Sequence, residues 1–153
     1  MEKTTLTFKE AINLQYIDNL RYLSKCTEGQ VSAGLFSMNL NQIFSIGING
    51  GPSKQQDCLC HTGKYGCVHA EQNCLVKNSN STDAKILICS KQCCQTCASL
   101  IVNSNMNIRE FWYIDSYKDD TGIKILENAG IKVFKIARDT IYKRLDKLGL
   151  NLT

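Results

Sequence analysis

The spacing of apolar positions divides the first part of the chain into one helix and two strands. Between Phe8 and Leu23 apolar residues recur at steps of three and four, which predicts an amphipathic helix that ends near Ser24. Two short β-favouring runs follow, VSAGLFSM and QIFSIGI, separated by NLN. Asparagine tolerates the left-handed backbone that tight turns require, so these runs predict a hairpin.

Strands and helices alternate in the second half of the chain. The predicted strands are AKILICS, IREFWYID and IKVFKI, and the predicted helices are AEQNCLVKN, QTCASLIVNS, GIKILENAG (closed by Gly130) and RDTIYKRLDKLG. This alternation favours a partly parallel sheet covered by helices. A length of 153 residues, 43% of them hydrophobic, suits one core of ordinary size, so we expect a single domain over residues 1–153.

One long segment, residues 49–66, has no periodicity. Its sequence, NGGPSKQQDCLCHTGKYG, contains the only proline of the chain and is rich in glycine. A structureless loop of this length is unusual in so small a domain. We therefore expect something other than core packing to order it.

Composition and charge narrow the class of protein. MEKTTLTFKE is charged from its second residue and no run of ~18 apolar residues occurs, so we expect no secretory signal, no membrane span and a cytoplasmic location. Nine cysteines, an odd number, then favour metal ligands or reactive thiols over disulfides. A net charge of +4 with scattered basic residues fits a small anionic substrate and argues against a nucleic-acid polymer as partner.

Two motifs, CVHAEQNC and CCQTC, contain residues suited to a catalytic metal. Cys94 and Cys97 lie three apart at the expected start of a helix, so both sulfurs can face one point, and His69 can complete the set. Three protein ligands leave the fourth position of a zinc ion for water. Glu71, two residues after the histidine, is placed to move protons to and from that water. This H-x-E and C-x-x-C pattern is typical of zinc deaminases of cytosine and adenine.

On these motifs the chain resembles the cytidine and deoxycytidylate deaminase superfamily. The segments SKCTEGQVSAG, GINGGP, CVHAEQN, CCQTC, FWYIDSYKDD and LENAGIKVF occur in the order found in its deoxycytidylate branch. The resemblance covers most of the chain. It implies a three-layer α/β/α sandwich with a five-stranded mixed sheet, a zinc cofactor, and hydrolytic deamination of deoxycytidine monophosphate (dCMP) to deoxyuridine monophosphate (dUMP) and ammonia. It also implies a homo-oligomer, often a hexamer, with dCTP and dTTP as effectors.

The resemblance also suggests residues outside the catalytic metal set. Asn49 is expected to contact the sugar and Tyr117 to lie near the pyrimidine, although these residues are also compatible with an ordinary turn and a surface aromatic. A second, structural zinc is expected on four cysteines of the first helix end and the long loop, with His61 as the substitute if one thiol points away. The four are Cys26, Cys58, Cys60 and Cys67. Four closed ligands would order that loop; free thiols are the alternative.

The chain departs from the family pattern at three positions. Cys93 stands where proline usually precedes the first cysteine of the C-x-x-C pair, so two neighbouring thiols compete for one ligand position; spacing favours Cys94. Ile48 replaces the usual tyrosine of GYNG, and Gln30 stands where a basic residue often precedes the first strand. These departures leave phosphate recognition open.

Other functions fit parts of the pattern. The deaminase could act on another base or nucleoside, such as cytidine, guanine or adenosine in transfer RNA, or accept the triphosphate. The fold could also serve as a non-catalytic zinc module. Glu71 speaks against the last, because a purely structural site has no use for a carboxylate beside an open metal position.

Overall fold

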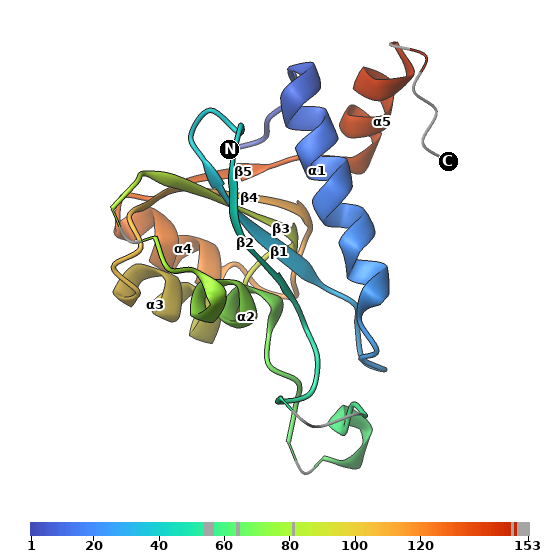
Figure 1. The fold of residues 1–153 in the computed structure, drawn as a ribbon, viewed down its shortest axis with the longest axis vertical. Coiled ribbons are helices and arrows are strands. Elements are labelled where there is room, and N and C mark those ends of the chain that lie inside the picture. The colour runs from blue at the N-terminus through green and yellow to red at the C-terminus, as the bar shows by residue number, and fades with distance from the viewer. Residues whose placement is uncertain (54–56, 64, 81, 148, 150–153) are drawn as a thin grey trace.

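A mixed sheet forms the middle layer of the molecule. The computed structural model describes residues 1–53, 57–63, 65–80, 82–147 and 149, and within them the strands are β1 Ser32–Ser37, β2 Ile43–Ile48, β3 Lys85–Lys91, β4 Ile108–Asp115 and β5 Lys132–Lys135. Their order in the sheet is β2-β1-β3-β4-β5 (Figure 1). β1 is antiparallel to both β2 and β3, whereas β3, β4 and β5 are parallel. The predicted hairpin and the predicted partly parallel sheet are both confirmed.

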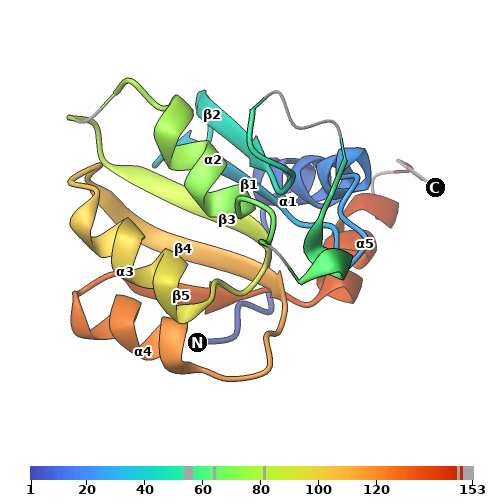
Figure 2. The ribbon, with the colours of Figure 1, turned by 90° about the horizontal axis from the view of Figure 1, so that it is seen from below.

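Helices cover both faces of this sheet. They are α1 Phe8–Leu20, α2 Ala70–Lys77, α3 Gln95–Asn103, α4 Thr121–Asn128 and α5 Arg138–Asp146. α1 and α5 lie on one face, and α2, α3 and α4 lie on the other (Figures 1 and 2). The expected three-layer α/β/α sandwich with a five-stranded mixed sheet is therefore confirmed. In the described part of the chain, no helix combines the length and the apolar character needed to cross a membrane.

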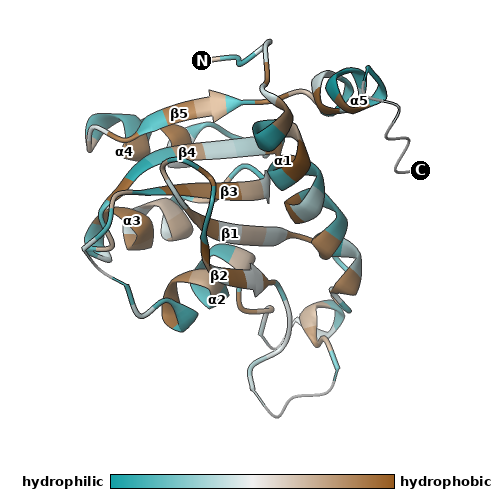
Figure 3. Cartoon of the chain, turned by 45° about the horizontal axis from the view of Figure 1, so that its top comes forward, coloured by the Kyte–Doolittle hydropathy of each residue, from teal (hydrophilic) through white to brown (hydrophobic). Residues whose placement is uncertain are grey.

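Alternation along the central strands supplies two separate cores. In β3, Ile86 and Ile88 pack towards α1 and α5, whereas Leu87 and Cys89 pack towards α2, α3 and α4. Successive side chains of a strand point to opposite faces, so a strand with helices on both sides must be apolar on both sides. Figure 3 shows β3 coloured as hydrophobic along most of its length.

The first helix and the hairpin follow from local side-chain chemistry. α1 begins with a capping box in which the Thr7 hydroxyl accepts from the Glu10 N–H and the Glu10 carboxylate accepts from the Thr7 N–H. In the hairpin turn the left-handed backbone falls on Leu40 (φ 59°), not on the asparagines beside it as the sequence suggested. The Leu40 side chain is buried in the α1 face of the core, and this burial offsets the strained conformation.

A cluster of charges fixes the end of β4. The Arg138 guanidinium donates to both carboxylate oxygens of Asp18 on α1 and of Asp115 at the end of β4, at 2.8–3.0 Å. These bonds hold the pKa of Asp115 below its ordinary value. The segment that contains Tyr117 leaves the sheet immediately after this anchored residue.

The connection from β2 to α2 extends away from the sheet, at the bottom of Figure 1. Its two ends are joined by an isolated bridge, in which the backbone groups of Gly50 and Val68 exchange hydrogen bonds of 2.8 and 3.2 Å. Beyond this bridge the described part of the connection contains one short 3₁₀ helix, Cys60–Thr62. The connection includes the segment for which the sequence predicted an ordering agent other than the core.

Candidate metal centre

Three side chains from two neighbouring helices meet at one point. His69 is the residue immediately before α2, Cys94 is the N-cap of α3, and Cys97 lies in the first turn of α3. The His69 Nδ1 atom lies 3.6 Å from the Cys94 Sγ and 3.3 Å from the Cys97 Sγ. All three atoms lie within 4.8 Å of one another. The structure thus brings together the trio that the two sequence motifs predicted.

The local backbone explains why these side chains converge. The Cys94 Sγ accepts the Cys97 N–H at 3.5 Å and so caps α3, as a serine or aspartate oxygen does in other helices. At α2, the Gln72 side chain accepts the His69 N–H at 2.9 Å. Helix N-termini carry partial positive charge, which favours the thiolate form of a cysteine placed there.

The spacing of the donor atoms fits zinc. Zinc binds thiolate at ~2.3 Å and imidazole at ~2.0–2.1 Å, so at tetrahedral angles a sulfur and a nitrogen lie about 3.6 Å apart. The two measured sulfur to nitrogen distances, 3.3 and 3.6 Å, are close to this value. Burial and the neighbouring Glu71 raise the pKa of the Cys97 thiol, and a bound divalent cation would reverse that shift by stabilising the thiolate.

Cys93, the competing thiol, lies outside this trio. Its side chain is fully buried in the core beneath α3 and α4. Gly122 on α4 packs against the carbonyl oxygens of Cys93 and Cys94, at a place where a Cβ atom would collide with the backbone. The packing of α4 therefore presses the Cys93–Cys94 turn into one orientation, with Cys94 facing His69.

Glu71 lies beside the trio in a largely water-free position. Its side chain is on the first turn of α2, and only 4% of the residue is exposed. Burial raises the pKa of its carboxyl to about 7, against the opposing effects of the Glu71 backbone N–H and of Cys97. Glu71, His69 and Cys94 line one cavity of about 280 Å³. A carboxyl group thus faces the same space as the candidate ligands without being one of them.

Both residues expected to contact substrate also line this cavity. Asn49 already has two structural bonds: its Oδ1 accepts the Val31 N–H at 2.8 Å and its Nδ2 donates to the Gly29 carbonyl at 2.7 Å. These bonds shape the wall formed by residues 29–31. One amide hydrogen and one lone pair of Asn49 are left for other partners. Contact of Asn49 and Tyr117 with substrate therefore stays a prediction.

Gln92 is a site residue that the sequence did not reveal. It is buried, lines the cavity, and accepts the Tyr117 N–H at 3.2 Å while donating to the Asp119 carbonyl at 2.7 Å. One amide side chain therefore fixes the segment that carries Tyr117 across the cavity. The only sequence signal was its position two residues before Cys94, and its partners are 25 and 27 residues away.

We expect Gln92→Ala to lower kcat/KM for the substrate by about tenfold, because two hydrogen bonds of roughly 0.5–1.5 kcal/mol each are lost around Tyr117. Zinc content should not change. Gln92→Glu, which keeps the acceptor for the Tyr117 N–H, should lose less. Steady-state kinetics of both variants test this. Equal kcat/KM in Gln92→Ala and the wild type would show that the Tyr117 segment does not depend on Gln92.

Gly47 on β2 allows α2 to lie directly on the sheet. A Cβ atom there would collide with the Ala70 carbonyl oxygen and the Cys74 N–H, and would lie 2.9 Å from the Cys74 Cβ. The Asn73 side chain and the Ser45 hydroxyl add hydrogen bonds of 2.8 Å between α2 and β2. The first turn of α2, which carries Glu71, therefore packs directly against β2, and only glycine at position 47 leaves room for this contact.

Gly47→Ala should reduce the free energy of unfolding by ~1–3 kcal/mol, because the added methyl meets backbone that cannot move independently of α2. It should also reduce turnover by about 10²-fold, since a displacement of ~1 Å in the first turn misplaces Glu71. Thermal denaturation and kinetics measure the two effects. Gly50→Ala is the matched control: a Cβ at Gly50 has no neighbour within 4 Å, so stability should change by less than ~0.5 kcal/mol. Wild-type stability and turnover in Gly47→Ala would contradict this packing argument.

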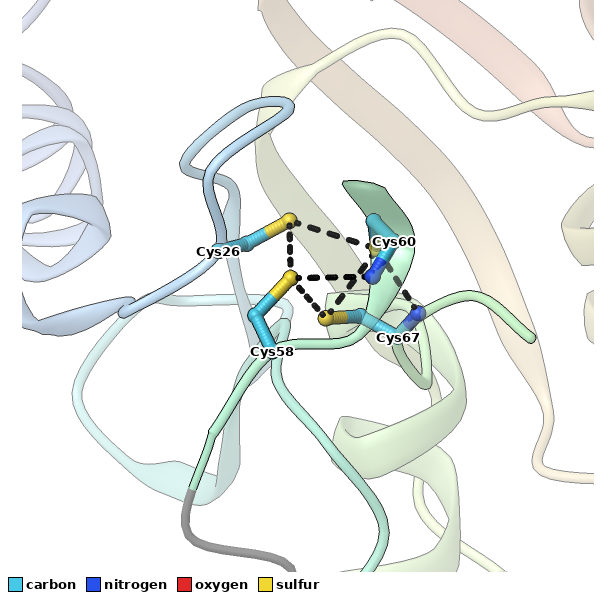
Figure 4. Close-up of side chains that lie close together, drawn as sticks. All are labelled: Cys26, Cys58, Cys60 and Cys67. Atoms are coloured by element: carbon cyan, nitrogen blue, oxygen red, sulfur yellow. Dashed lines mark hydrogen bonds between the residues drawn. The ribbon is translucent and has the colours of Figure 1, made fainter. Parts of the chain in front are cut away.

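A second group of sulfurs lies in the long connection (Figure 4). Cys26, from the segment after α1, meets Cys58, Cys60 and Cys67, and the four sulfurs point towards a common centre. Four of the sulfur to sulfur distances are 3.5, 3.5, 3.7 and 3.8 Å. Tetrahedral zinc with four thiolates requires about 3.8 Å. The geometry therefore fits a closed structural site.

Backbone groups support the same cluster. The Cys58 Sγ accepts the Cys60 N–H at 3.5 Å, and the Cys60 Sγ accepts the Cys67 N–H at 3.2 Å. Hydrogen bonds from Thr27 and Cys60 lower the pKa of the Cys58 thiol to about 6. His61 is exposed and is not among the clustered ligand atoms. Since no thiol points away, the condition under which His61 would substitute is not met.

The two clusters share a wall. Cys26, Cys60 and Cys67 line the same cavity as His69 and Glu71. A disturbance of the four-cysteine cluster therefore reaches the cavity directly.

Comparison with known proteins places this site in a family. The family model of the cytidine and deoxycytidylate deaminase zinc-binding region matches residues 7–114. The dCMP deaminase of cyanophage S-TIM5 in apo form is 28% identical with a TM-score of 0.69, over 83% of this chain and 95% of that chain. Its complex with dCMP and dUMP is 27% identical with a TM-score of 0.72, over 81% and 93%.

More distant structures share the fold alone. Acinetobacter baumannii RibD is 18% identical with a TM-score of 0.61, over 94% of this chain and 40% of that chain. No curated protein sequence gives a significant match. The family model nevertheless spans well over half of the sequence, and the S-TIM5 structures match most of both chains. The chain belongs to the family of cytidine and deoxycytidylate deaminases.

Proposed function

We propose that this protein hydrolyses dCMP to dUMP and ammonia. The observation that carries the proposal is that the buried Glu71 lines the same cavity as His69 and Cys94, two members of the metal-binding trio. A structural metal site has no need of such a group. The substrate is proposed from the S-TIM5 dCMP deaminase, whose structure in complex with dCMP and dUMP is similar to this one over most of both chains.

In this proposal His69, Cys94 and Cys97 would hold a zinc ion. Bound there, zinc would supply Lewis acidity and would make water a nucleophile near neutral pH. Glu71 moves one proton of the attacking water to the ring nitrogen, where it stays in dUMP, and then moves the second to the departing amine, which leaves as ammonia. The water oxygen replaces the amino group on the ring carbon, so water and dCMP give dUMP and ammonia.

The remaining walls of the cavity orient the nucleotide. Asn49 uses its free amide hydrogen and lone pair on the sugar, while its two structural bonds hold the Gly29 to Val31 wall. Tyr117, fixed through Gln92, packs near the pyrimidine. The low exposure of Glu71 keeps bulk water away from the proton transfers.

A substrate panel tests the proposal. Zinc-loaded protein is offered dCMP, dCDP, dCTP, deoxycytidine, cytidine, guanine and transfer RNA, with ammonia release and the ultraviolet spectrum as readouts. We expect dCMP to have the highest kcat/KM. Preference for another base would establish a different deaminase, and zinc binding without any ammonia release would indicate a non-catalytic zinc module. Either result would overturn the proposal.

Regulation and assembly complete the proposal. By its relation to the deoxycytidylate branch we expect dCTP and dTTP to be effectors and the protein to be a homo-oligomer, with a hexamer as the first candidate. The same assay with each triphosphate added, together with light scattering of the zinc-loaded protein, tests these expectations.

A further inference from the structure

Lys91 places a positive charge on the wall of the cavity. It is the last residue of β3, it is half-buried, and it lines the cavity together with Glu71 and His69. Its Nζ lies 5.6 Å from the centre of the Tyr117 ring. The ammonium group is therefore oriented by an aromatic face beside the space in which the substrate is proposed to bind.

In the described part of the chain Lys91 has no ion pair, and its charge acts only at longer range, as one of the smaller causes of the lowered pKa of Asp115. Among the described residues, the ammonium group of Lys91 forms no ion pair and no hydrogen bond. Asp115 is opposite Lys91 in the sheet, but both of its carboxylate oxygens are bound by Arg138. Glu28 also lines the cavity, but it is exposed, and an exposed carboxylate is screened by water.

A half-buried ammonium without an ion pair is free to bind an anionic group of a ligand. A phosphate monoester provides a negative charge and strong acceptor oxygens, whereas a nucleoside provides neither. Gln30, at the position where a basic residue often occurs in the family, donates instead to the Ser24 carbonyl at 2.8 Å. Gln30 carries no charge, and one of its two amide hydrogens is already used in this bond.

From this arrangement we infer that Lys91 binds the phosphate of the substrate and determines the preference for a nucleotide over the nucleoside. The inference rests on the proposed function, because it assigns the phosphate end of that same site. Lys91 contacts substrate but takes no part in proton transfer. Replacing Lys91 should therefore change the ratio of the kcat/KM values for dCMP and deoxycytidine.

Lys91→Met and Lys118→Met form a matched pair of variants. The Lys118 Nζ also lies 5.6 Å from the centre of the Tyr117 ring, but Lys118 is exposed and does not line the cavity. Lys91→Met should lower kcat/KM for dCMP roughly 10- to 100-fold, the loss of a hydrogen bond between charged groups. The decrease in kcat/KM that Lys91→Met causes for deoxycytidine should be at least about tenfold smaller. Lys118→Met should leave the ratio of the two kcat/KM values within about threefold of wild type.

Two more variants and an equilibrium measurement keep the test decisive. Lys91→Arg should restore most of the nucleotide preference, and Lys91→Gln serves if Lys91→Met does not fold. Calorimetric affinities for dUMP and deoxyuridine report phosphate binding without turnover, and the dUMP preference should fall by the same 10- to 100-fold in Lys91→Gln. An unchanged preference in a folded Lys91→Met or Lys91→Gln variant overturns the inference.

The proposed function fails in a different way. If the wild type releases ammonia from neither dCMP nor deoxycytidine, that function is wrong, while the dUMP and deoxyuridine affinities still decide the role of Lys91.

Discussion

Glu71→Gln should lower kcat for dCMP by roughly 10²- to 10⁴-fold, the range expected when a general acid/base is removed. Glutamine has the size of glutamate and can still form hydrogen bonds, but it cannot accept a proton from water and pass it to the ring. Zinc content should equal that of wild type, because Glu71 is not among the clustered ligand atoms. The unfolding temperature should not fall, since burying an amide costs less than burying a carboxylate.

The matched control is Glu127→Gln, the same chemical change on an exposed residue of α4. It should keep kcat within about threefold of wild type. Steady-state kinetics, metal analysis and thermal denaturation of both variants complete the experiment. Wild-type turnover in Glu71→Gln would show that the proposed proton path is wrong, whatever the fold.

The double variant Cys58→Ala/Cys67→Ala should lose one zinc ion per chain and become markedly less stable. Metal binding free energy at a closed site is folding free energy, because the loop between β2 and α2 has little core of its own. We expect a loss of at least ~3 kcal/mol, which for a chain of this size lowers the unfolding temperature by roughly 6–12 °C. Turnover should fall too, since Cys60 and Cys67 form part of the cavity wall.

Metal analysis and thermal scans with and without chelator measure these effects. Cys74→Ala is the control, because Cys74 is a buried thiol outside both clusters and its loss should not change the zinc content. If the double variant binds as much zinc as the wild type and keeps its unfolding temperature, the four cysteines do not hold a zinc ion.

The sequence predicted the layers and the trio because both depend on short-range spacing. The apolar run of β3 and the three- and four-residue steps in α1 are local patterns: the first indicates a strand buried on both sides, and the second indicates which side of the helix is buried. Cys94 and Cys97 are three apart on one helix, so their convergence is also local. His69 had to be matched to them across 25 residues by the motif.

Long-range contacts could not be predicted in the same way. Arg138 and Asp18 are 120 residues apart in sequence, and nothing in either neighbourhood indicates their pairing. Lys91 and Gln92 reach the cavity because the end of β3 lies beside the end of β4, and the segment of Tyr117 follows β4. The collision that forbids a side chain at Gly47 depends on how α2 crosses β2. These features follow from the topology of the sheet, which no local pattern specifies.

The central claim is that His69, Cys94 and Cys97 hold a zinc ion and leave one position for water. X-ray absorption at the zinc edge, on wild-type protein of measured zinc content, tests this most directly. The account predicts about two zinc ions per chain with, on average, about three sulfur neighbours and about one nitrogen or oxygen neighbour each. No zinc ion, a single zinc ion with four sulfur neighbours, or two zinc ions with a sulfur average above three because a further cysteine fills the open position, would contradict it.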